Sequence, residues 1–430
     1  MNEALVLALV FAVLLFAGVP ISFAIGSAAV AALLMSLDPA AATTVVAQRL
    51  ATGLDSFALL AIPFFILAGQ LMNRGGIARR LIDLAKVIVG RLPGGLAYVN
   101  ILGSMLFGSI SGSAVAAAAA IGGTMSPLMK KEGYNREFCA AVNISSAPIG
   151  LLIPPSNIMV VYSLASGGVS IAALFIAGYV PGILLGLALM VVVAVIAKLR
   201  SYPVGERIAL GAGVRIFFAS LPSLFLVLLV MGGIILGWFT PTEASAIAVA
   251  YSFVLSVVIY REIPWRELPG LLTDAAATTA IVLLLVGTSM GMSWVMSSAN
   301  IPQSVTAALL ALTDDKITLL IIINVLLLIV GTFMDMTPAV LIFTPILLPV
   351  VQKFGMSPLH FGLVLIFNLC IGLCTPPVGN CLFVGCSVAQ TTIAKVWRPL
   401  LPFFFAMFVV LMLVTYWPAL SLALPKALGF

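Results

Sequence analysis

The sequence predicts an all-α polytopic membrane protein of about ten spans with two re-entrant hairpins and two inverted repeats. Three observations support this fold class. Of the 430 residues, 63% are hydrophobic and 8% are charged, whereas soluble domains carry roughly 25% charged residues. The stretch 138–197 has no charged residue and is long enough for two spans. The third observation is an internal repeat. This composition excludes a soluble globular protein.

The apolar segments give the expected order of elements. We predict ten spans, near residues 4–18, 20–36, 57–72, 137–163, 170–198, 216–237, 242–260, 272–298, 357–390 and 396–422. Two further apolar segments, 97–128 and 317–352, are interrupted at mid-length by polar and glycine-rich sequence, and we interpret each as a re-entrant hairpin. Segment 77–92 has apolar residues at helical spacing with basic residues opposite, which is typical of an amphipathic helix on the cytoplasmic surface.

The basic residues indicate the orientation. In this arrangement 16 of the 20 lysines and arginines fall in loops on one side, which the positive-inside rule assigns to the cytoplasm. The four on the other side are Arg49, Lys316, Lys353 and Lys426. Treating either interrupted segment as a full crossing would destroy this separation, so charge favours the hairpins. The first apolar segment has no basic leader and no cleavage site, and we expect it to be a span that starts outside.

An internal repeat relates the two halves of the chain. The residues Ile149-Gly150-Leu151 and Pro154-Pro155 recur as Ile371-Gly372-Leu373 and Pro376-Pro377, an offset of 376 − 154 = 222. Three further pairs match at this offset: Pro127 with Pro349, Lys131 with Lys353, and Gly133 with Gly355. Because spans 137–163 and 357–390 run in opposite directions, the repeats are inverted. Inverted repeats with broken helices are typical of secondary transporters, whose sites lie near the bilayer midplane.

The repeat also suggests how the chain is divided. We expect residues 1–56 and 201–270 to be scaffold helices, 57–200 to form the first repeat and 271–430 to form the second. Each repeat then contains one hairpin followed by one broken helix. These pairs are hairpin 97–128 with helix 137–163, and hairpin 317–352 with helix 357–390.

The first pair carries a cluster of oxygen ligands. The hairpin turns at Gly108-Ser109-Ile110-Ser111-Gly112-Ser113, and the helix breaks at Pro154-Pro155-Ser156-Asn157. Glycine permits a close backbone approach, and proline frees backbone carbonyls. Such irregular backbone is tolerated at membrane depth only where protein buries it or it lines a cavity. Carbonyl, hydroxyl and amide oxygens suit a hard cation such as Na⁺. The alternative is a small-residue packing face formed by Gly108 and Gly112.

The second pair offers the same chemistry with one charge added. Its hairpin turns at residues 331–338 and its helix breaks at residues 374–380. Asp335 is exceptional, because an aspartate at membrane depth costs roughly 2.5–3.5 kcal/mol on insertion scales and is functional by default. The alternative is a hairpin tip that reaches the outer water. Glu243, at the mouth of a span, is interpreted as a helix cap.

These features favour a Na⁺-coupled transporter of an organic anion. A proton pathway usually shows several intramembrane carboxylates or histidines, whereas this chain offers little beyond Asp335 and a single histidine, His360. Two broken pairs predict at least two Na⁺ sites, and half-helix amino termini attract a carboxylate. The alternative is a proton-coupled organic anion transporter that works without a binding protein. The five cysteines form no CxxC pair and are expected to be buried hydrophobes.

Other functional classes lack their residues in this sequence. A channel needs a continuous polar pore, whereas the polar residues here gather at two mid-depth breaks. The sequence has no HExxH motif and no plausible Ser–His pair for an intramembrane enzyme. It also has no GxxxxGK[ST] motif for a primary pump, which a partner would have to supply.

The motifs resemble a known family. The stretch 108–157, together with GTFMDMTPAVLIFTPILLP at 331–349 and GLCTPPVGN at 372–380, is similar to the large membrane subunit of tripartite ATP-independent periplasmic (TRAP) transporters. The resemblance covers essentially the whole chain. It implies an elevator-type, Na⁺-driven transporter of the ion transporter superfamily, placed in the bacterial inner membrane with both termini periplasmic. It also implies organic anion substrates such as C4-dicarboxylates, keto acids and sialic acid.

The resemblance further implies partners and site residues. The partners are a small four-helix membrane subunit, expected as a separate polypeptide, and a periplasmic substrate-binding protein. The Na⁺ sites would pair each hairpin with its broken helix through Ser109, Ser111, Ser113, Gly150 and Asn157, and through Gly331, Asp335, Thr337, Gly372 and Thr375. Substrate would lie between the two hairpin tips, near Ser111, Ser156, Asn157, Asp335, Met336, Thr337 and Asn380.

Overall fold

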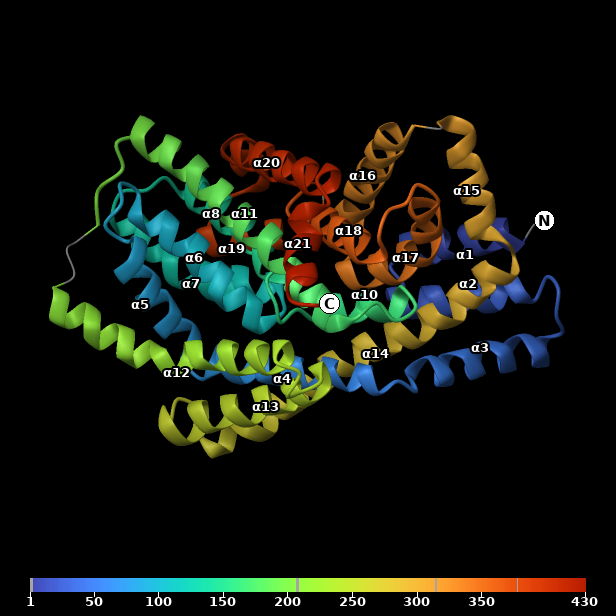
Figure 1. Cartoon of the computed structure of the whole chain (residues 1–430), viewed down its shortest axis with the longest axis horizontal. Coiled ribbons are helices and arrows are strands. Elements are labelled where there is room, and N and C mark those ends of the chain that lie inside the picture. The colour runs from blue at the N-terminus through green and yellow to red at the C-terminus, as the bar shows by residue number, and fades with distance from the viewer. Residues whose placement is uncertain (1–2, 206–208, 314, 377) are drawn as a thin grey trace.

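The computed structural model describes residues 3–205, 209–313, 315–376 and 378–430, and within these ranges the chain is folded almost entirely into helices (Figure 1). Ahead of the first hairpin lie α1 (Glu3–Phe16), α2 (Ile21–Leu33), α3 (Pro39–Leu54), the short 3₁₀ helix η1 (Phe57–Leu60), α4 (Ala61–Arg74) and α5 (Ile77–Val89). The first hairpin and broken helix comprise α6 (Gly95–Ser111), α7 (Ala114–Lys131), α8 (Arg136–Ser146), α9 (Ile149–Leu152) and α10 (Asn157–Ala165).

The second half follows the same order. The connecting helices are α11 (Ile171–Leu199), α12 (Leu210–Ile235), α13 (Pro241–Phe253) with the π-helical η2 (Val254–Ile259), η3 (Trp265–Glu267), α14 (Leu268–Ser298) and α15 (Ile301–Leu312). The second hairpin and broken helix comprise α16 (Lys316–Phe333), α17 (Met336–Lys353), α18 (Pro358–Gly372) and α19 (Asn380–Ala389). The chain ends with α20 (Ile393–Tyr416) and α21 (Ala419–Ala427).

The helix boundaries confirm the internal repeat and extend it. Helices α7 and α17 begin 336 − 114 = 222 residues apart, as do α8 and α18, and α11 and α20. The packing is reciprocal too, because α10 packs against α17 while α19 packs against α7. Each half-helix beyond a break therefore rests on the hairpin of the other repeat. This exchange of partners is what two repeats related by a two-fold axis produce.

Both predicted breaks are present. In the first repeat, the segment Arg136–Leu152 and helix α10 are bent by 53° at the prolines. In the second repeat, α18 ends at Gly372 and α19 begins at Asn380. Eight helices are long and apolar enough to cross a membrane within the described residues, or nine when the bent pair counts as one span. Helices α1 and α2 are shorter, with 14 and 13 residues.

Two helices were missed by the sequence reading, α3 and α15. Helix α3 packs against α14, and α15 packs against α17. Helix α15 begins 301 − 77 = 224 residues after α5 begins, which is close to the repeat offset of 222. The two helices therefore hold corresponding positions in the order of the two repeats. The predicted amphipathic helix α5 is confirmed as amphipathic, because it buries Ile77, Leu81 and Ala85 while the charged side chain of Arg79 is exposed.

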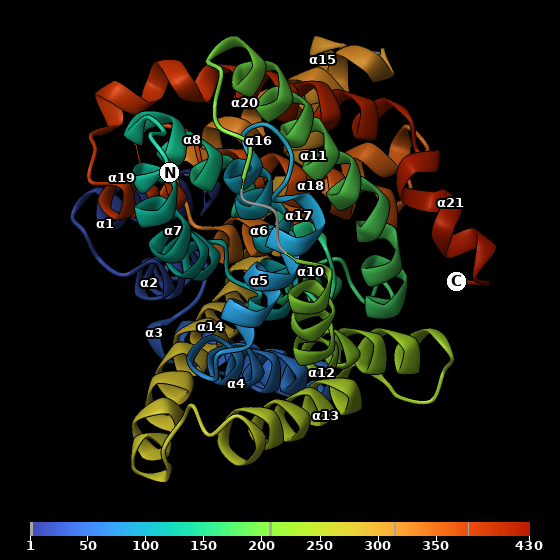
Figure 2. The ribbon, with the colours of Figure 1, turned by 90° about the vertical axis from the view of Figure 1, so that its left-hand side faces the viewer.

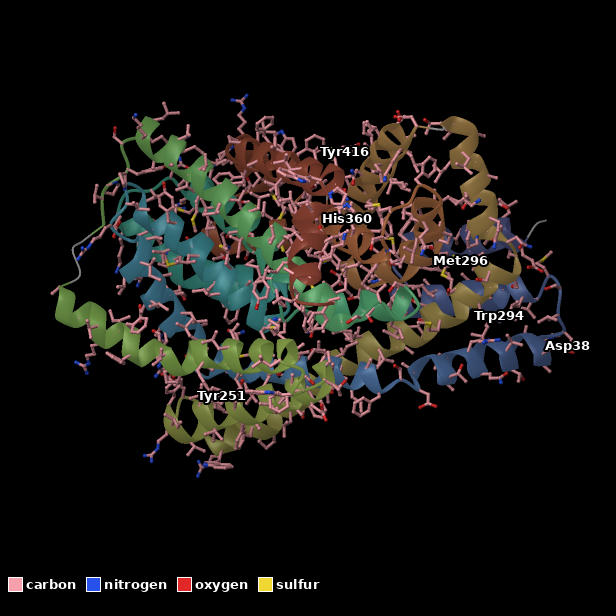
Figure 3. All side chains as sticks on the ribbon, viewed as in Figure 1. Asp38, Tyr251, Trp294, Met296, His360 and Tyr416 are labelled. Atoms are coloured by element: carbon pink, nitrogen blue, oxygen red, sulfur yellow. The ribbon has the colours of Figure 1, made fainter. Side chains whose placement is uncertain are left out.

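The helices form two packed groups around the site (Figures 1 and 2). One group contains α2, α3, α4, α13 and α14, with α4 packed on α13 and α14 packed on α2 and α3. The other contains the hairpins, the broken helices, α11 and α20. The only histidine is buried in this second group, where Nε2 of His360 lies 3.2 Å from the carbonyl oxygen of Thr415 (Figure 3). The five cysteines are free thiols and buried, as expected.

Candidate functional site

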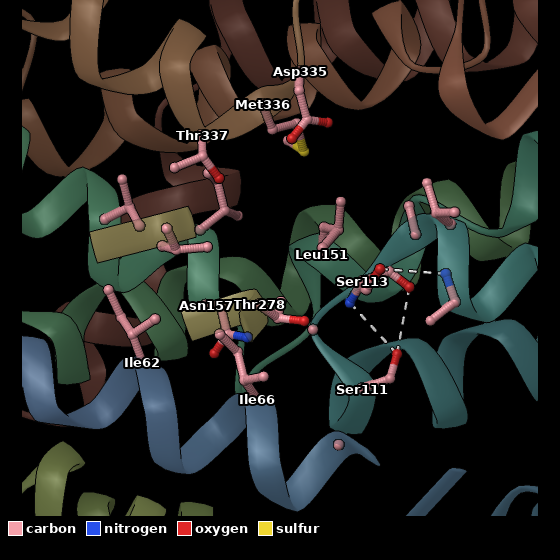
Figure 4. Close-up of a pocket in the computed structure, with 18 of the residues that line it drawn as sticks. Ile62, Ile66, Ser111, Ser113, Leu151, Asn157, Thr278, Asp335, Met336 and Thr337 are labelled. Carbon is pink, nitrogen blue, oxygen red and sulfur yellow. Dashed lines mark hydrogen bonds between the residues drawn. The ribbon is translucent and has the colours of Figure 1, made fainter. Parts of the chain in front are cut away.

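The tip of the first hairpin is held by local hydrogen bonds. Gly112 ends α6 in the left-handed conformation, with φ of 61°. This conformation suits glycine and turns the chain directly into α7. Ser113 then caps α7 by accepting a hydrogen bond from the N–H of Ala116 at 3.2 Å. The hydroxyl of Ser111 lies 3.5 Å from the N–H of Ser113 (Figure 4). The serines are thus part of the turn itself.

The first tip packs directly on the broken helix. A Cβ atom on Gly108 would lie 2.7 Å from the Cα of Gly150, a separation that real side chains do not adopt. A Cβ atom on Gly112 would lie 2.8 Å from Nδ2 of Asn157. Both glycines therefore serve close approach. Gly108 does pack closely, as the packing alternative expects, and this contact also brings the hairpin oxygens beside the break.

The second tip repeats this backbone geometry. A Cβ atom on Gly372 would lie 2.5 Å from the carbonyl carbon of Gly331. The N–H of Gly379 donates to the carbonyl of Thr332 at 3.4 Å, which ties the break to the hairpin. The hydroxyl of Thr375 donates to the carbonyl of Ile371 at 2.8 Å. Its lone pairs stay available for a ligand.

Asp335 distinguishes the second tip from the first. It precedes α17 in an extended conformation, at the position where an N-cap residue stands. Its carboxylate accepts a hydrogen bond from Nδ2 of Asn380 at 3.2 Å. This bond links the hairpin to the start of α19. The carboxylate faces the cavity between the tips, so it is not enclosed in apolar packing (Figure 4).

A cavity of about 400 Å³ separates the two tips. It is lined by the first turns of three helices, α7, α10 and α17, and by side chains of α4 and α14 (Figure 4). Helix amino termini carry unpaired N–H groups and a partial positive charge. Ile62 and Ile66 of α4 form an apolar wall opposite them. The arrangement suits a small molecule with an anionic end.

The structure gathers most of the predicted residues here. Those that line the cavity are Ser111, Ser113, Asn157, Asp335, Met336 and Thr337. The glycines at positions 150, 331 and 372 lie behind them, at the backbone contacts. Ser156, Thr375 and Asn380 are not among the residues known to line the cavity. Ser156 is fully buried, and its hydroxyl has no partner among the described residues. The side chain of Ser109 lies outside the described residues.

Sequence reasoning missed the polar residues on the opposite wall. Gln70 and Asn73 of α4 and Thr278 of α14 also line the cavity. The amide oxygen of Gln70 is buried and has no partner among the described residues. A signal for it existed, because Gln70 and Asn73 are polar residues three apart in an apolar span and so share one helix face. Glu243 is confirmed as a cap, since it forms a capping box with Thr240.

Comparison with known proteins gives this arrangement a family. The model of the tripartite ATP-independent periplasmic transporter, DctM component, matches residues 8–420. The chain belongs to this family. It is therefore a multi-pass TRAP transporter permease and not an enzyme. The resemblance drawn from the hairpin and break motifs is confirmed over nearly the whole chain.

Two relatives of this TRAP permease have similar lengths, and a third is longer. The Uncharacterized protein YgiK of Salmonella typhimurium is 59% identical over 96% of this chain and 95% of its own. The C4-dicarboxylate TRAP transporter large permease protein DctM of Pseudomonas aeruginosa is 40% identical over 87% of this chain and 88% of its own. The isethionate TRAP transporter permease protein DctMQ of Oleidesulfovibrio alaskensis is 41% identical over 96% of this chain, but the match covers 65% of that protein.

A solved structure supports the fold of the permease. The YdaH transporter of Alcanivorax borkumensis has a TM-score of 0.68, with 90% of this chain and 91% of that chain covered. The two sequences are 14% identical. The likeness therefore concerns the fold alone, and the all-helical fold class is confirmed.

Proposed function

We propose that this permease imports an organic anion, driven by Na⁺, with an elevator movement of the hairpin-bearing helices. One observation supports the anion above all: the first turns of α7, α10 and α17 line a single cavity. Three partial positive charges meet there, while the residues known to line it include no lysine or arginine. A carboxylate or sulfonate would accept hydrogen bonds from these N–H groups.

The proposed Na⁺ sites lie at the two contacts between tip and break. At the first contact, α6 and α9 both end near the close approach of Gly108 and Gly150, and the last carbonyls of a helix have no partner within it. The serine hydroxyls and the Asn157 amide add oxygens to this set. At the second contact, α16 and α18 end in the same way around Gly331 and Gly372. Oxygen-only sets of this kind suit hard cations.

Asp335 gives the proposal a reason for coupling. Its carboxylate lines the same cavity as the helix amino termini, so it repels an anionic substrate while it is unpaired. A Na⁺ ion bound at the second contact would neutralise this charge before the substrate binds. The hydrogen bond from Asn380 holds the carboxylate toward that contact. Substrate affinity should then depend on the Na⁺ concentration.

The cavity also suggests which side is open. It extends to Asn73 and Thr278, next to the ion pair in which Nη2 of Arg74 lies 2.6 Å from Oδ2 of Asp274. The basic residues assign this end of α4 to the cytoplasm. Figure 1 places the end of α11 and the start of α12 at the left, opposite the N-terminus at the right. We infer an inward-facing state in the bacterial inner membrane, with both termini periplasmic.

The partners belong to the same proposal. A periplasmic substrate-binding protein would deliver the anion, and a small four-helix membrane subunit would pack against the permease. The name DctMQ and the 65% coverage of that relative leave room there for a second module. C4-dicarboxylates, sialic acid and isethionate are the substrate classes to test.

The deciding experiment is uptake into proteoliposomes that contain the permease, its small subunit and its binding protein. Labelled succinate, sialic acid and isethionate would be offered with a Na⁺ gradient, a pH gradient or neither. We expect uptake of one of them only with the Na⁺ gradient. Uptake driven by the pH gradient alone, and without the binding protein, would replace this proposal with proton coupling through Asp335.

A further inference from the structure

A second cavity lies away from the transport site, where the ends of three helices meet. It has a volume of about 780 Å³ and lies between the end of α11, the beginning of α20 and the beginning of α8. Both α11 and α20 are long enough to span the membrane. Figure 1 shows these ends of α11 and α20 together at the upper left. The cavity thus opens at one end of two spans and not in the transport pathway.

The charges in this cavity are mostly of one sign. Arg200, Lys395 and Arg398 line it together with one acidic residue, Glu137. None of the three cations forms an ion pair with another described residue. Glu137 occupies the first turn of α8, where the helix dipole stabilises it. Three cations and one carboxylate leave an excess of two positive charges for a ligand.

Helix ends add to this positive field. Helix α20 begins at the cavity, and its N-cap residue Thr392 makes no capping hydrogen bond. The N–H of Lys395 donates to the carbonyl of Thr392 at 3.1 Å, so the N–H groups of Ile393 and Ala394 are the ones that could face an anion here. Helix α8 also begins here, although Asn135 caps it by accepting from the N–H groups of Glu137 and Phe138.

The walls of the cavity are apolar. Ile196, Leu199, Pro399 and Pro402 line it beside the charged groups. Phe138 forms part of the same lining and contacts Tyr202, with the ring centroids 5.1 Å apart and the rings tilted by 31°. The surface continues outward along the two spans through apolar side chains, since Leu199 is 79% exposed and Phe405 is 71% exposed. Exposed apolar side chains on helices long enough to span a membrane suit contact with acyl chains.

We propose that this cavity is a binding site for an anionic membrane phospholipid, with its phosphate held by Arg200, Lys395 and Arg398 and its acyl chains along α11 and α20. Basic pockets between spanning helices on the cytoplasmic side suit such headgroups. The positive-inside rule places this end in the cytoplasmic leaflet. A free phosphate would use the cations but leave the apolar walls and the adjoining exposed face uncovered.

The test uses the purified complex of permease and small subunit, stripped of lipid in detergent. Phosphatidylglycerol, phosphatidylcholine and inorganic phosphate would be titrated separately, with binding followed by native mass spectrometry and thermal stability. We expect phosphatidylglycerol to be retained and to raise the melting temperature. We expect phosphatidylcholine and inorganic phosphate to do neither. The double variant Lys395→Gln/Arg398→Gln should bind phosphatidylglycerol on the order of 10- to 30-fold more weakly.

Matched variants separate binding from folding. Arg215→Gln/Arg266→Gln removes two exposed basic residues expected on the same side but outside the cavity, and should bind like the wild type. Lys395→Arg/Arg398→Lys keeps the charge and should restore binding. In phosphatidylcholine alone, the cavity variant Lys395→Gln/Arg398→Gln should melt at the wild-type temperature. Equal losses in both Gln variants, retention in the cavity variant, or equal stabilisation by inorganic phosphate would each overturn the lipid site.

Discussion

The two hairpin tips share a backbone arrangement but differ in their side-chain chemistry. In each, a glycine of the hairpin meets a glycine of the broken helix, Gly108 with Gly150 and Gly331 with Gly372. The first tip places neutral serines around this contact, with Ser111 bonded to Ser113. The second places Asp335 there, bonded to the amide of Asn380. One tip is therefore neutral and the other is charged.

This difference shows what duplication fixed and what diverged afterwards. Close backbone approach depends on the absence of a Cβ atom on both sides, so neither glycine can change alone. The proposed ligand side chains are not constrained in this way, because carbonyls from the helix ends would supply part of each proposed site. A transporter that must couple two unlike ligands gains from such divergence. Under the proposed coupling, the charged tip would respond to the anion and the neutral tip would not.

The largest effect should come from filling the glycine contact of the second tip. In Gly372→Ala the new Cβ would lie 2.5 Å from the backbone of Gly331, which forces the hairpin away from the break. We expect uptake to fall by about 100-fold, since displacing ligands by about 1 Å has such an effect. The control is Gly123→Ala in α7, which has no atom within 4 Å and should transport normally.

The corresponding change at the first tip sharpens the comparison. Gly108→Ala would place its Cβ 2.7 Å from the Cα of Gly150, so a similar loss is expected. Normal uptake in Gly108→Ala with loss in Gly372→Ala would mean that only the second contact binds a ligand. Normal uptake in both would contradict a role for either contact.

The next largest effect, on Na⁺ affinity, distinguishes the charged proposed ligand from a neutral one. Asp335→Asn removes a charge that hydrogen bonds and a cation would share, a loss of about 2–3 kcal/mol, or roughly 100-fold in Na⁺ affinity. Ser111→Ala removes one neutral ligand, about 1 kcal/mol, or roughly 5-fold. The Na⁺ concentration for half-maximal uptake measures both. Equal effects of the two variants would contradict the asymmetry between the tips.

The Asp335→Asn variant should also show an effect on substrate binding that a purely structural role of Asp335 would not produce. If Na⁺ neutralises Asp335 before the anion binds, then Asp335→Asn should bind substrate with less dependence on Na⁺. Substrate affinity at low and high Na⁺ should converge in this variant and stay apart in Ser111→Ala. An unchanged Na⁺ dependence in Asp335→Asn would place the coupling elsewhere.

Local sequence patterns were sufficient for the tips. The prolines, the glycines and Asp335 each break a rule of apolar helices, so they stand out without any knowledge of packing. Helix α3 was missed, although Asp38 before Pro39 is a start signal and its carboxylate accepts from the N–H of Ala41 at 2.7 Å. Its threonines, Gln48 and Arg49 lower its hydropathy below that of a span.

The opposite wall of the cavity depended on tertiary structure. Thr278 lies in a long apolar helix, and nothing in its neighbours distinguishes it from a threonine bonded to its own helix, as it is to Asp274 at 2.9 Å. Only the packing of α14 beside α4 brings it to the cavity. The second cavity, lined by Arg200, Lys395 and Arg398, could not be predicted from the sequence for the same reason. Arg200 lies at the end of α11 and Arg398 lies near the beginning of α20, so only tertiary packing brings them together.

The smallest predicted effect is on thermal stability and concerns the beginning of the second hairpin, where α16 starts. Asp315 caps α16 by accepting hydrogen bonds from the N–H of Thr318 at 2.9 Å and from its hydroxyl at 2.8 Å. These bonds lower the pKa of the Asp315 carboxyl below its ordinary value. The first hairpin has no such cap, since α6 begins after Gly94 with no side-chain bond. Only the second hairpin should therefore lose stability in acid.

The direction of this pH dependence follows from the lowered pKa of the Asp315 carboxyl. The stabilisation is complete above the pKa of a free aspartate, about 3.9, and disappears as the pH falls through the lower folded value. Asp315→Asn keeps the cap shape without the charge, so the wild type should melt higher than the variant at pH 6, by less than about 2 °C because the group is exposed. The melting temperatures should converge once the pH falls below the lowered pKa of the Asp315 carboxyl. A difference that persists in acid would mean that the charge of Asp315 contributes nothing to the hairpin.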